Sequence, residues 1–193
     1  MNRIVGTLIV PLLIMASPCE ASAIFKKPLN LQRAAPEETK YKNLKTQADE
    51  LTEAVLKADY GRAVDLTFPK LIELMGGRRK FISVMEEGMK EMQSEQFRIM
   101  SITVEEPEGV VEAESQIYAI VPTTMRIKVP EGTLVGKAFM IGVSKDGGKH
   151  WTFVDSGGRS MDKRKLKILF PSAADKLRIP EIERPVLYRQ SSP

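Results

Sequence analysis

The spacing of apolar residues divides the chain into a helical first half and a strand-rich second half. Over residues 41–58 apolar side chains recur three and four positions apart, which places them on one face of a helix. We expect shorter helices to follow at 59–67, 69–75 and 78–93. Their boundaries carry helix signals: an aspartate that can act as a cap, a proline suited to a first turn, and a glycine pair that ends a helix.

Beyond residue 96 the apolar pattern changes to the alternation that is typical of strands. The alternating segments are residues 97–104, 117–129, 134–144 and 151–154. A turn is expected at 107–109, and Pro122 suggests an edge strand or a bulge in the longest segment. Helices followed by antiparallel strands predict an α+β fold, with N-terminal helices packed on a strongly bent antiparallel sheet. A short helix at 162–169 and an extended, proline-punctuated tail complete this prediction.

The first 23 residues have the features of a signal peptide. Arg3 gives a positive start, residues 4–15 are apolar but too few to span a bilayer, and the small residues around Ala23 fit cleavage after it. We therefore expect an exported protein, in the periplasm or outside the cell. Cys19 leaves a lipoprotein as an alternative, although Pro18 departs from that pattern.

After cleavage the prediction leaves a linker at 24–36, an α+β domain at 37–158 and a basic helix with its tail at 159–193. No transmembrane span is expected in the processed chain. Of 193 residues, 29 are Lys or Arg and 25 are Asp or Glu, a surplus too mild to indicate nucleic-acid binding. The surplus lies at the C-terminus, where residues 157–193 hold 9 basic and 4 acidic side chains.

The residue types of most metal sites and nucleophilic triads are scarce, because the chain has one His and one Cys. We expect no metal and no cofactor. Met85, Met89 and Met92 carry thioethers that can bind Cu(I). Their spacing is also that of a buried helix face, and we interpret them as core residues.

The order of elements over residues 40–156 resembles the nuclear transport factor 2-like fold, which ketosteroid isomerase and the SnoaL-type cyclases share. Two motifs narrow the resemblance to a group of small exported bacterial proteins of uncharacterised function: Thr67-Phe68-Pro69-Lys70 with Gly76-Gly77, and the segment 144–151. The resemblance implies a cone with an internal pocket and a long N-terminal helix across its open side. For enzymes of this fold it implies an Asp or His base and a Tyr or Asp donor in the pocket. Such a widely reused fold assigns no chemistry by itself.

The segment Ser144-x-Asp146-x-Gly148-x-x-Trp151 matches the Asp-box pattern known from sialidases and other β-rich proteins. We interpret it as a motif that stabilises a hairpin turn. Its short polar side chains form hydrogen bonds with backbone amides of the turn, glycine adopts a positive φ, and the indole ring packs beneath the turn. A calcium or sugar contact at Asp146 is the alternative. His150 in the same turn is the default general base, but the sequence places no carboxylate to orient it.

Six polar residues are candidates to face the pocket of a cone: Tyr60, Asp65, Tyr118, Thr123, Thr124 and Asp155. For ligand binding we single out Tyr60, Tyr118 and Thr123. The candidates for acid or base catalysis are Tyr60, Asp65, Asp155 and His150. None of them lies in a motif that matches the enzymes residue by residue.

The predicted C-terminal helix is basic, with Lys163, Arg164, Lys165 and Lys167. These side chains are expected to form a solvated face while Leu166 and Phe170 dock on the sheet. The alternative is a contact with anionic lipid or with an acidic partner.

These patterns favour an exported, non-enzymatic binding module, whose apolar pocket holds a small ligand or a protein partner. The alternative is a pocket enzyme of isomerase or hydrolase type that uses a buried Asp/Tyr pair. A third hypothesis is an assembly protein that forms a homodimer through its sheet. Binding is favoured over catalysis because no recognisable catalytic set is present.

Overall fold

The computed structural model describes residues 41–158 and 161–189, which belong to one compact unit. The segments predicted as signal peptide and linker, with Cys19, lie outside the described residues. Four helices come first: α1 (Lys42–Leu56), α2 (Tyr60–Asp65), α3 (Pro69–Leu74) and α4 (Arg78–Ser94).

The helix boundaries follow from local sequence signals. The Asp59 carboxylate accepts a hydrogen bond from Arg62 N at 3.0 Å and so caps α2. Pro69 occupies the first turn of α3, where its missing N–H costs no helical hydrogen bond. Ala58 is exposed and has a positive φ of 57°, so α1 ends before it and is shorter than predicted.

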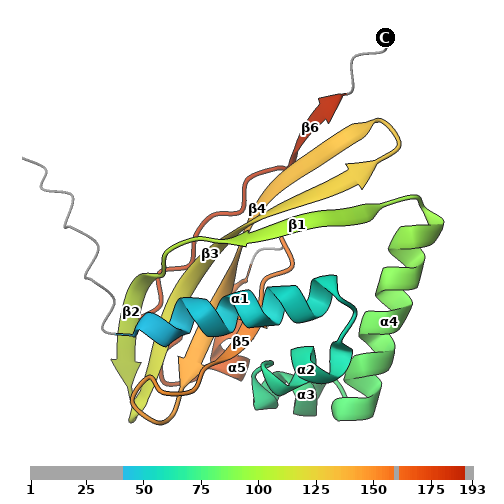
Figure 1. The fold of residues 1–193 in the computed structure, drawn as a ribbon. Coiled ribbons are helices and arrows are strands. Elements are labelled where there is room, and N and C mark those ends of the chain that lie inside the picture. The colour runs from blue at the N-terminus through green and yellow to red at the C-terminus, as the bar shows by residue number, and fades with distance from the viewer. Residues whose placement is uncertain (1–40, 159–160, 190–193) are drawn as a thin grey trace, which may run out of the picture. The chain divides into compact units, whose positions relative to one another are not determined.

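Six strands form one antiparallel sheet: β1 (Arg98–Val104), β2 (Glu108–Ala113), β3 (Gln116–Val129), β4 (Gly132–Ser144), β5 (Thr152–Asp155) and β6 (Val186–Arg189). β3 and β4 form the centre. The short strands β1 and β2 lie along the outer side of β3, and β5 and β6 lie along the outer side of β4. The sheet is strongly curled, and α1 lies across one face of it (Figure 1). The predicted α+β fold, with helices packed on a bent antiparallel sheet, is confirmed.

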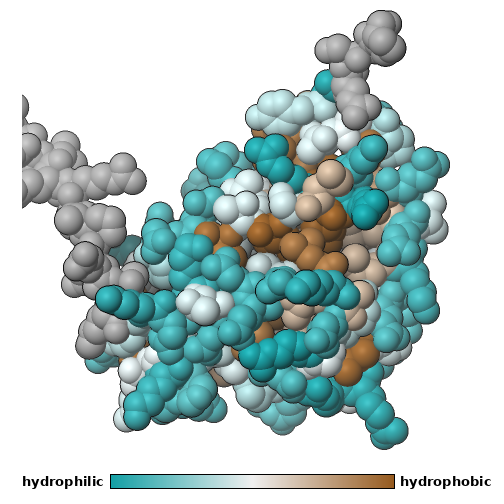
Figure 2. All heavy atoms as spheres, viewed as in Figure 1, coloured by the Kyte–Doolittle hydropathy of each residue, from teal (hydrophilic) through white to brown (hydrophobic). Residues whose placement is uncertain are grey.

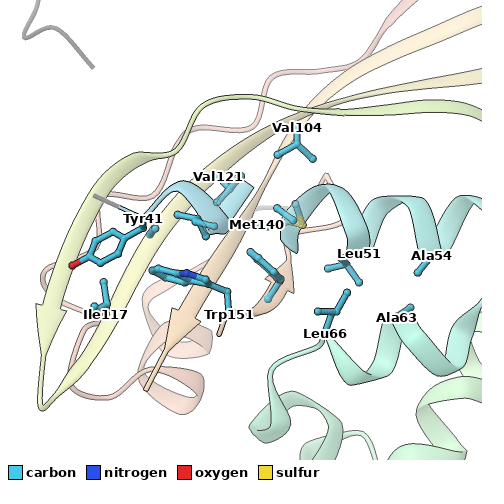
Figure 3. Close-up of a cluster of buried hydrophobic side chains, with 14 residues drawn as sticks. Tyr41, Leu51, Ala54, Ala63, Leu66, Val104, Ile117, Val121, Met140 and Trp151 are labelled. Atoms are coloured by element: carbon cyan, nitrogen blue, oxygen red, sulfur yellow. The ribbon is translucent and has the colours of Figure 1, made fainter. Parts of the chain in front are cut away.

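α1 packs against what we call the front face of the sheet, to which β3 contributes Ile117, Ala119 and Val121. The buried side chains of the helix are Leu44, Ala48, Leu51, Thr52 and Ala54. Figure 3 shows this core, to which Tyr41 and Trp151 add aromatic rings with centroids 5.6 Å apart. The apolar period of residues 41–58 is therefore explained by contact with the sheet.

The C-terminal segment covers the opposite face of the sheet, which we call the back face. The helix α5 (Lys163–Leu169) buries Leu166 there. Phe170 is fully buried, with its ring centroid 5.3 Å from that of Phe68 and 5.9 Å from that of Tyr118. The chain then forms β6, which pairs with the first residues of β4, 132–135. The boundary predicted at residue 158 thus separates two parts of one compact unit.

Two details of the strand prediction are wrong. The chain does not reverse at 107–109, because β2 begins at Glu108 and the turn lies at Glu114 and Ser115, both with positive φ. Pro122 does not lie at an edge, because β3 is a central strand, and neither register shift in the pairing of β1 and β2 with β3 lies at Pro122. Its ring nitrogen faces the junction between β1 and β2, the side on which its carbonyl accepts from Glu105 N at 2.9 Å. Proline has no N–H to return a hydrogen bond to Glu105, which lies between the end of β1 and the start of β2.

The burial of Phe170 can be tested by removing its ring. We expect Phe170→Ala to lower the free energy of unfolding by about 3–5 kcal/mol, because it leaves a cavity in the back-face core. Ile168→Ala is the control, since Ile168 is 52% exposed and its loss should change stability by about 0.5 kcal/mol or less. Urea denaturation measures both variants. Equal, small effects would contradict the packing of the C-terminal segment on the sheet.

Candidate binding pocket

A cavity of about 290 Å³ lies between the front face of the sheet and the helices α1, α3 and α4. Its apolar lining is Leu51 and Val55 from α1, Leu71 from α3, Phe81 and Met85 from α4, and Ile99, Ile102, Met125, Met140 and Phe153 from the strands. Its polar lining is Thr52, Thr67, Thr123 and Asp155. A concave, mainly apolar site with a few polar groups is typical of small-molecule binding.

The cavity exists because none of the described helices closes this part of the front face. α4 buries none of its side chains completely. Its apolar residues Phe81, Met85, Met89 and Met92 share one side of the helix but are only half-buried. Met85 lines the cavity, so this side of α4 borders an opening instead of a closed core. Figure 2 shows a hydrophobic surface between α1, α4 and β1, framed by hydrophilic residues.

Strand register decides which side chains of the sheet reach the cavity. Met140 in β4 pairs with Val121 on one side and with Asp155 on the other, so Asp155 lies on the front face. Thr123 lies two residues beyond Val121 and faces the same way. Thr123 and Asp155 are therefore the two candidate residues from the sequence that line the cavity.

The three threonines differ in what their hydroxyl groups offer to a ligand. Thr52 Oγ1 donates to Asp49 O at 2.9 Å, and Thr67 Oγ1 donates to Ala63 O at 2.8 Å, so both protons are already used. The Thr123 hydroxyl has no hydrogen bond to another described residue, and its oxygen is not fully buried. Thr123 therefore offers both a donor and an acceptor to the cavity.

Asp155 is the one ionisable side chain among the described residues that line this cavity. Its Oδ1 accepts a hydrogen bond from Gly157 N at 3.0 Å, whereas Oδ2 has no partner in the described part of the chain. Asp155 is an exposed residue at the end of β5, although many protein atoms lie near its carboxyl group. Loss of surrounding water raises the pKa of Asp155, and the Gly157 bond opposes this effect only partly. Such a carboxyl group in a cleft is a candidate functional group.

The two tyrosines predicted for the pocket lie elsewhere. Tyr118 faces the back of the sheet, where its hydroxyl is 3.0 Å from Gln116 Oε1 and 3.2 Å from Ser172 Oγ. Tyr60 begins α2 and does not line the cavity. Among the described lining residues there is accordingly no phenol to accompany Asp155.

Asp65 and Thr124 also lie outside the cavity. Asp65 forms an ion pair with Arg78, which donates to Gly61 O at 3.0 Å as well. Both charged side chains are half-exposed, so solvent screens this pair. Thr124 Oγ1 donates to Glu105 at 3.4 Å on the other face of the sheet.

Side-chain hydrogen bonds hold the turn that follows β4. Ser144 Oγ donates to Asp146 Oδ1 at 2.9 Å and accepts from Gly148 N at 2.9 Å. Trp151 is 1% exposed beneath the turn, and its Nε1 donates to Gly148 O at 3.0 Å. Gly147 and Gly148 both adopt positive φ, which glycine allows at low cost.

His150 has an orienting carboxylate, contrary to the expectation from the sequence. Its Nδ1 lies 2.5 Å from Asp146 Oδ2, and its backbone N donates to Asp146 Oδ1 at 2.9 Å. The backbone and side-chain bonds from His150 hold the pKa of Asp146 well below its usual range. The imidazole is 85% exposed and does not line the cavity, so this pair lies in solvent.

The four basic side chains of the C-terminal helix, Lys163, Arg164, Lys165 and Lys167, are exposed. Leu166 is turned inward, and Lys163 pairs with Asp175 at 3.2 Å. Within residues 41–158 and 161–189 no three His, Cys, Asp or Glu side chains gather as a metal site would require. In the same ranges no helix has the length and apolar character needed to cross a membrane.

A comparison with models of known protein families found no match, and a comparison with curated proteins found none either. The cavity and its lining are therefore the basis for a functional hypothesis.

Sequence reasoning did not identify the apolar lining of the cavity. Ile102 and Met125 lie in predicted strands, and Met85 lies in a predicted helix. Periodicity shows which side chains of an element share one face, but it does not show what packs against that face. The one usable signal was the methionine-rich side of residues 78–93. Methionine is flexible and is common on surfaces that adapt to a ligand.

Gly148 allows a test of how tightly the turn packs on the core. A Cβ atom there would lie 2.2 Å from Tyr41 Cδ1, and its φ is +89°. We expect Gly148→Ala to lower the free energy of unfolding by about 2–5 kcal/mol, because backbone strain and overpacking add. Gly147→Ala is the matched control: its φ is +75°, but nothing lies within 4 Å, so about 1–2 kcal/mol is expected. Equal losses in urea denaturation would contradict the contact with Tyr41.

Proposed function

We propose that the protein is an exported, non-enzymatic binding module whose cavity holds a small apolar molecule. The observation that carries this proposal is the lining, in which ten of fourteen residues are apolar. A ligand that covers such a surface gains about 25 cal/mol for each Å² of apolar area removed from water. The four polar lining residues are few enough to orient a ligand without making the site hydrophilic.

A second cavity supports an elongated ligand. It has a volume of about 160 Å³ and shares Met125 with the first cavity. Its apolar lining continues along the same hairpin and reaches the segment before β6 through Ile127, Leu134, Gly136, Ala138 and Pro185. A chain-like molecule would use both spaces, whereas a compact one would use only the first.

The wider relationship and the location are part of the same proposal. A long helix across a strongly curled sheet, with a cavity between them, supports a nuclear transport factor 2-like fold. The export of the protein rests on the signal-peptide features of residues 1–23.

A pocket enzyme is the second candidate function, and Asp155 is the observation that favours it. A carboxyl group with a raised pKa is suited to general acid or base catalysis. Isomerases of the kind considered above also need a donor that stabilises charge on the substrate. The described lining offers the Thr123 hydroxyl for this task and no phenol, so the arrangement supports binding better than catalysis.

Binding of a neutral apolar dye tests the proposed function. We expect Nile red to bind the purified protein with enhanced emission, because the lining shields the dye from water. Val55→Phe places a larger side chain against the cavity and should weaken dye binding about tenfold or more. Leu56→Phe is the matched control, since the neighbouring Leu56 is 42% exposed and does not line the cavity.

A second pair of variants distinguishes a loss of dye binding from a loss of folding. Ile102 lines the cavity from β1, whereas Thr103 is exposed on the other face of the same strand. Ile102→Phe should weaken dye binding and Thr103→Phe should not, with thermal denaturation to confirm that each variant is folded. No dye binding, or equal binding by all four variants, would contradict the proposed function.

A further inference from the structure

Asp155 is the feature of the cavity that an entirely apolar ligand does not explain. It is the single carboxyl group among ten apolar and three threonine side chains in the described lining. Lys and Arg are absent from that lining, so no described cation compensates its charge there. The second cavity has Lys137, but this side chain pairs with Glu183 at 3.3 Å.

The hydrogen bonds of Asp155 depend on what occupies the cavity. Oδ1 already accepts from Gly157 N, whereas Oδ2 has no protein partner among the described residues, and Asp155 as a residue is exposed. A ligand that fills the cavity removes water from Oδ2. A polar group that loses water without gaining a new partner weakens binding, and a charged group does so most. No described residue donates a second hydrogen bond to Asp155, so the donor has to come from the ligand.

We propose that the ligand is an amphiphile whose polar end carries an N–H or O–H donor, an alcohol or a protonated amine, that hydrogen-bonds to Asp155 Oδ2. This inference rests on the proposed function, because it assigns the polar end of the same ligand. The apolar part lies against the lining toward Met125, and the second cavity takes its further length. Thr123 faces the same cavity and supplies a second hydrogen-bonding group for the polar end.

The same geometry discriminates against other polar ends. A fatty acid would bring a second carboxylate to Asp155, and two like charges at close range disfavour ionisation of both. A plain hydrocarbon would leave Oδ2 without a partner. A protonated amine both donates a hydrogen bond and compensates the charge, and such charge-assisted bonds are the strongest of their kind. We therefore expect affinity to decrease from amine to alcohol to acid.

Three amphiphiles with the same alkyl chain test this order: dodecylamine, dodecanol and dodecanoic acid. Each is used below its micelle concentration to displace Nile red from the purified protein. The amine should bind about tenfold or more tightly than the acid, with the alcohol between them. Asp155→Asn keeps an acceptor for Gly157 N but removes the charge, and it should reduce the preference for amine over acid by about tenfold.

Asp175→Asn is the control for net charge. It removes the same charge from an exposed ion pair with Lys163 outside the cavity, and it should leave the order of affinities unchanged. Equal displacement by all three amphiphiles in the unmodified protein overturns the inference, as does a preference that survives Asp155→Asn. In both cases bound Nile red leaves the proposed function standing. If Nile red does not bind at all, the proposed function and the inference both fail.

Discussion

The length of the β3–β4 pair is the constraint on which the rest of the structure depends. β3 has 14 residues, so at about 3.3 Å per residue it extends over roughly 45 Å. α1 has 15 residues, and at about 1.5 Å per residue it reaches roughly 22 Å. One helix of this length can cover about half of the front face. α4 stands beside the other half but buries no side chain completely, and the cavity is the consequence.

The two faces of this hairpin differ where no helix covers them closely. On β3, Arg126 and Lys128 face backward and are exposed, as expected for a sheet surface in water. Met125 and Ile127 alternate with them and face forward, and they are only half-buried. Contiguous apolar surface that stays accessible marks an interaction site in soluble proteins. At this end of β3 the front face therefore has the composition of a surface that a ligand covers, whereas the back face has that of a surface left to solvent.

The parts of the fold that could be predicted are those that local sequence determines. The apolar period predicted α1, the cap at Asp59 predicted the start of α2, and the alternation of apolar residues predicted β3 and β4. β2 was missed because its glutamates and Gly109 hide the alternation of a short strand. The role of Phe170 was only partly foreseen, since proline spacing suggested a tail where the chain instead closes the back-face core. A pocket was expected only from the resemblance to a cone fold. Its position and lining could not be predicted, because they arise from the mismatch in length between a helix and a hairpin.

Asp155 places the single ionisable side chain of the described lining in the cavity that this mismatch leaves. β5 ends at Asp155, and Gly157 and Gly158, both with positive φ, then turn the chain away from the sheet. The carboxyl group is thus left at the border of the cavity with one backbone donor. As a catalyst it would have to take up a proton with no second ionisable group in the described lining to continue the transfer. As a binding group it only has to stay ionised, and a donor on the ligand favours that form, because hydrogen bonding to a carboxylate lowers its pKa. Binding therefore needs fewer functional groups in this cavity than catalysis does.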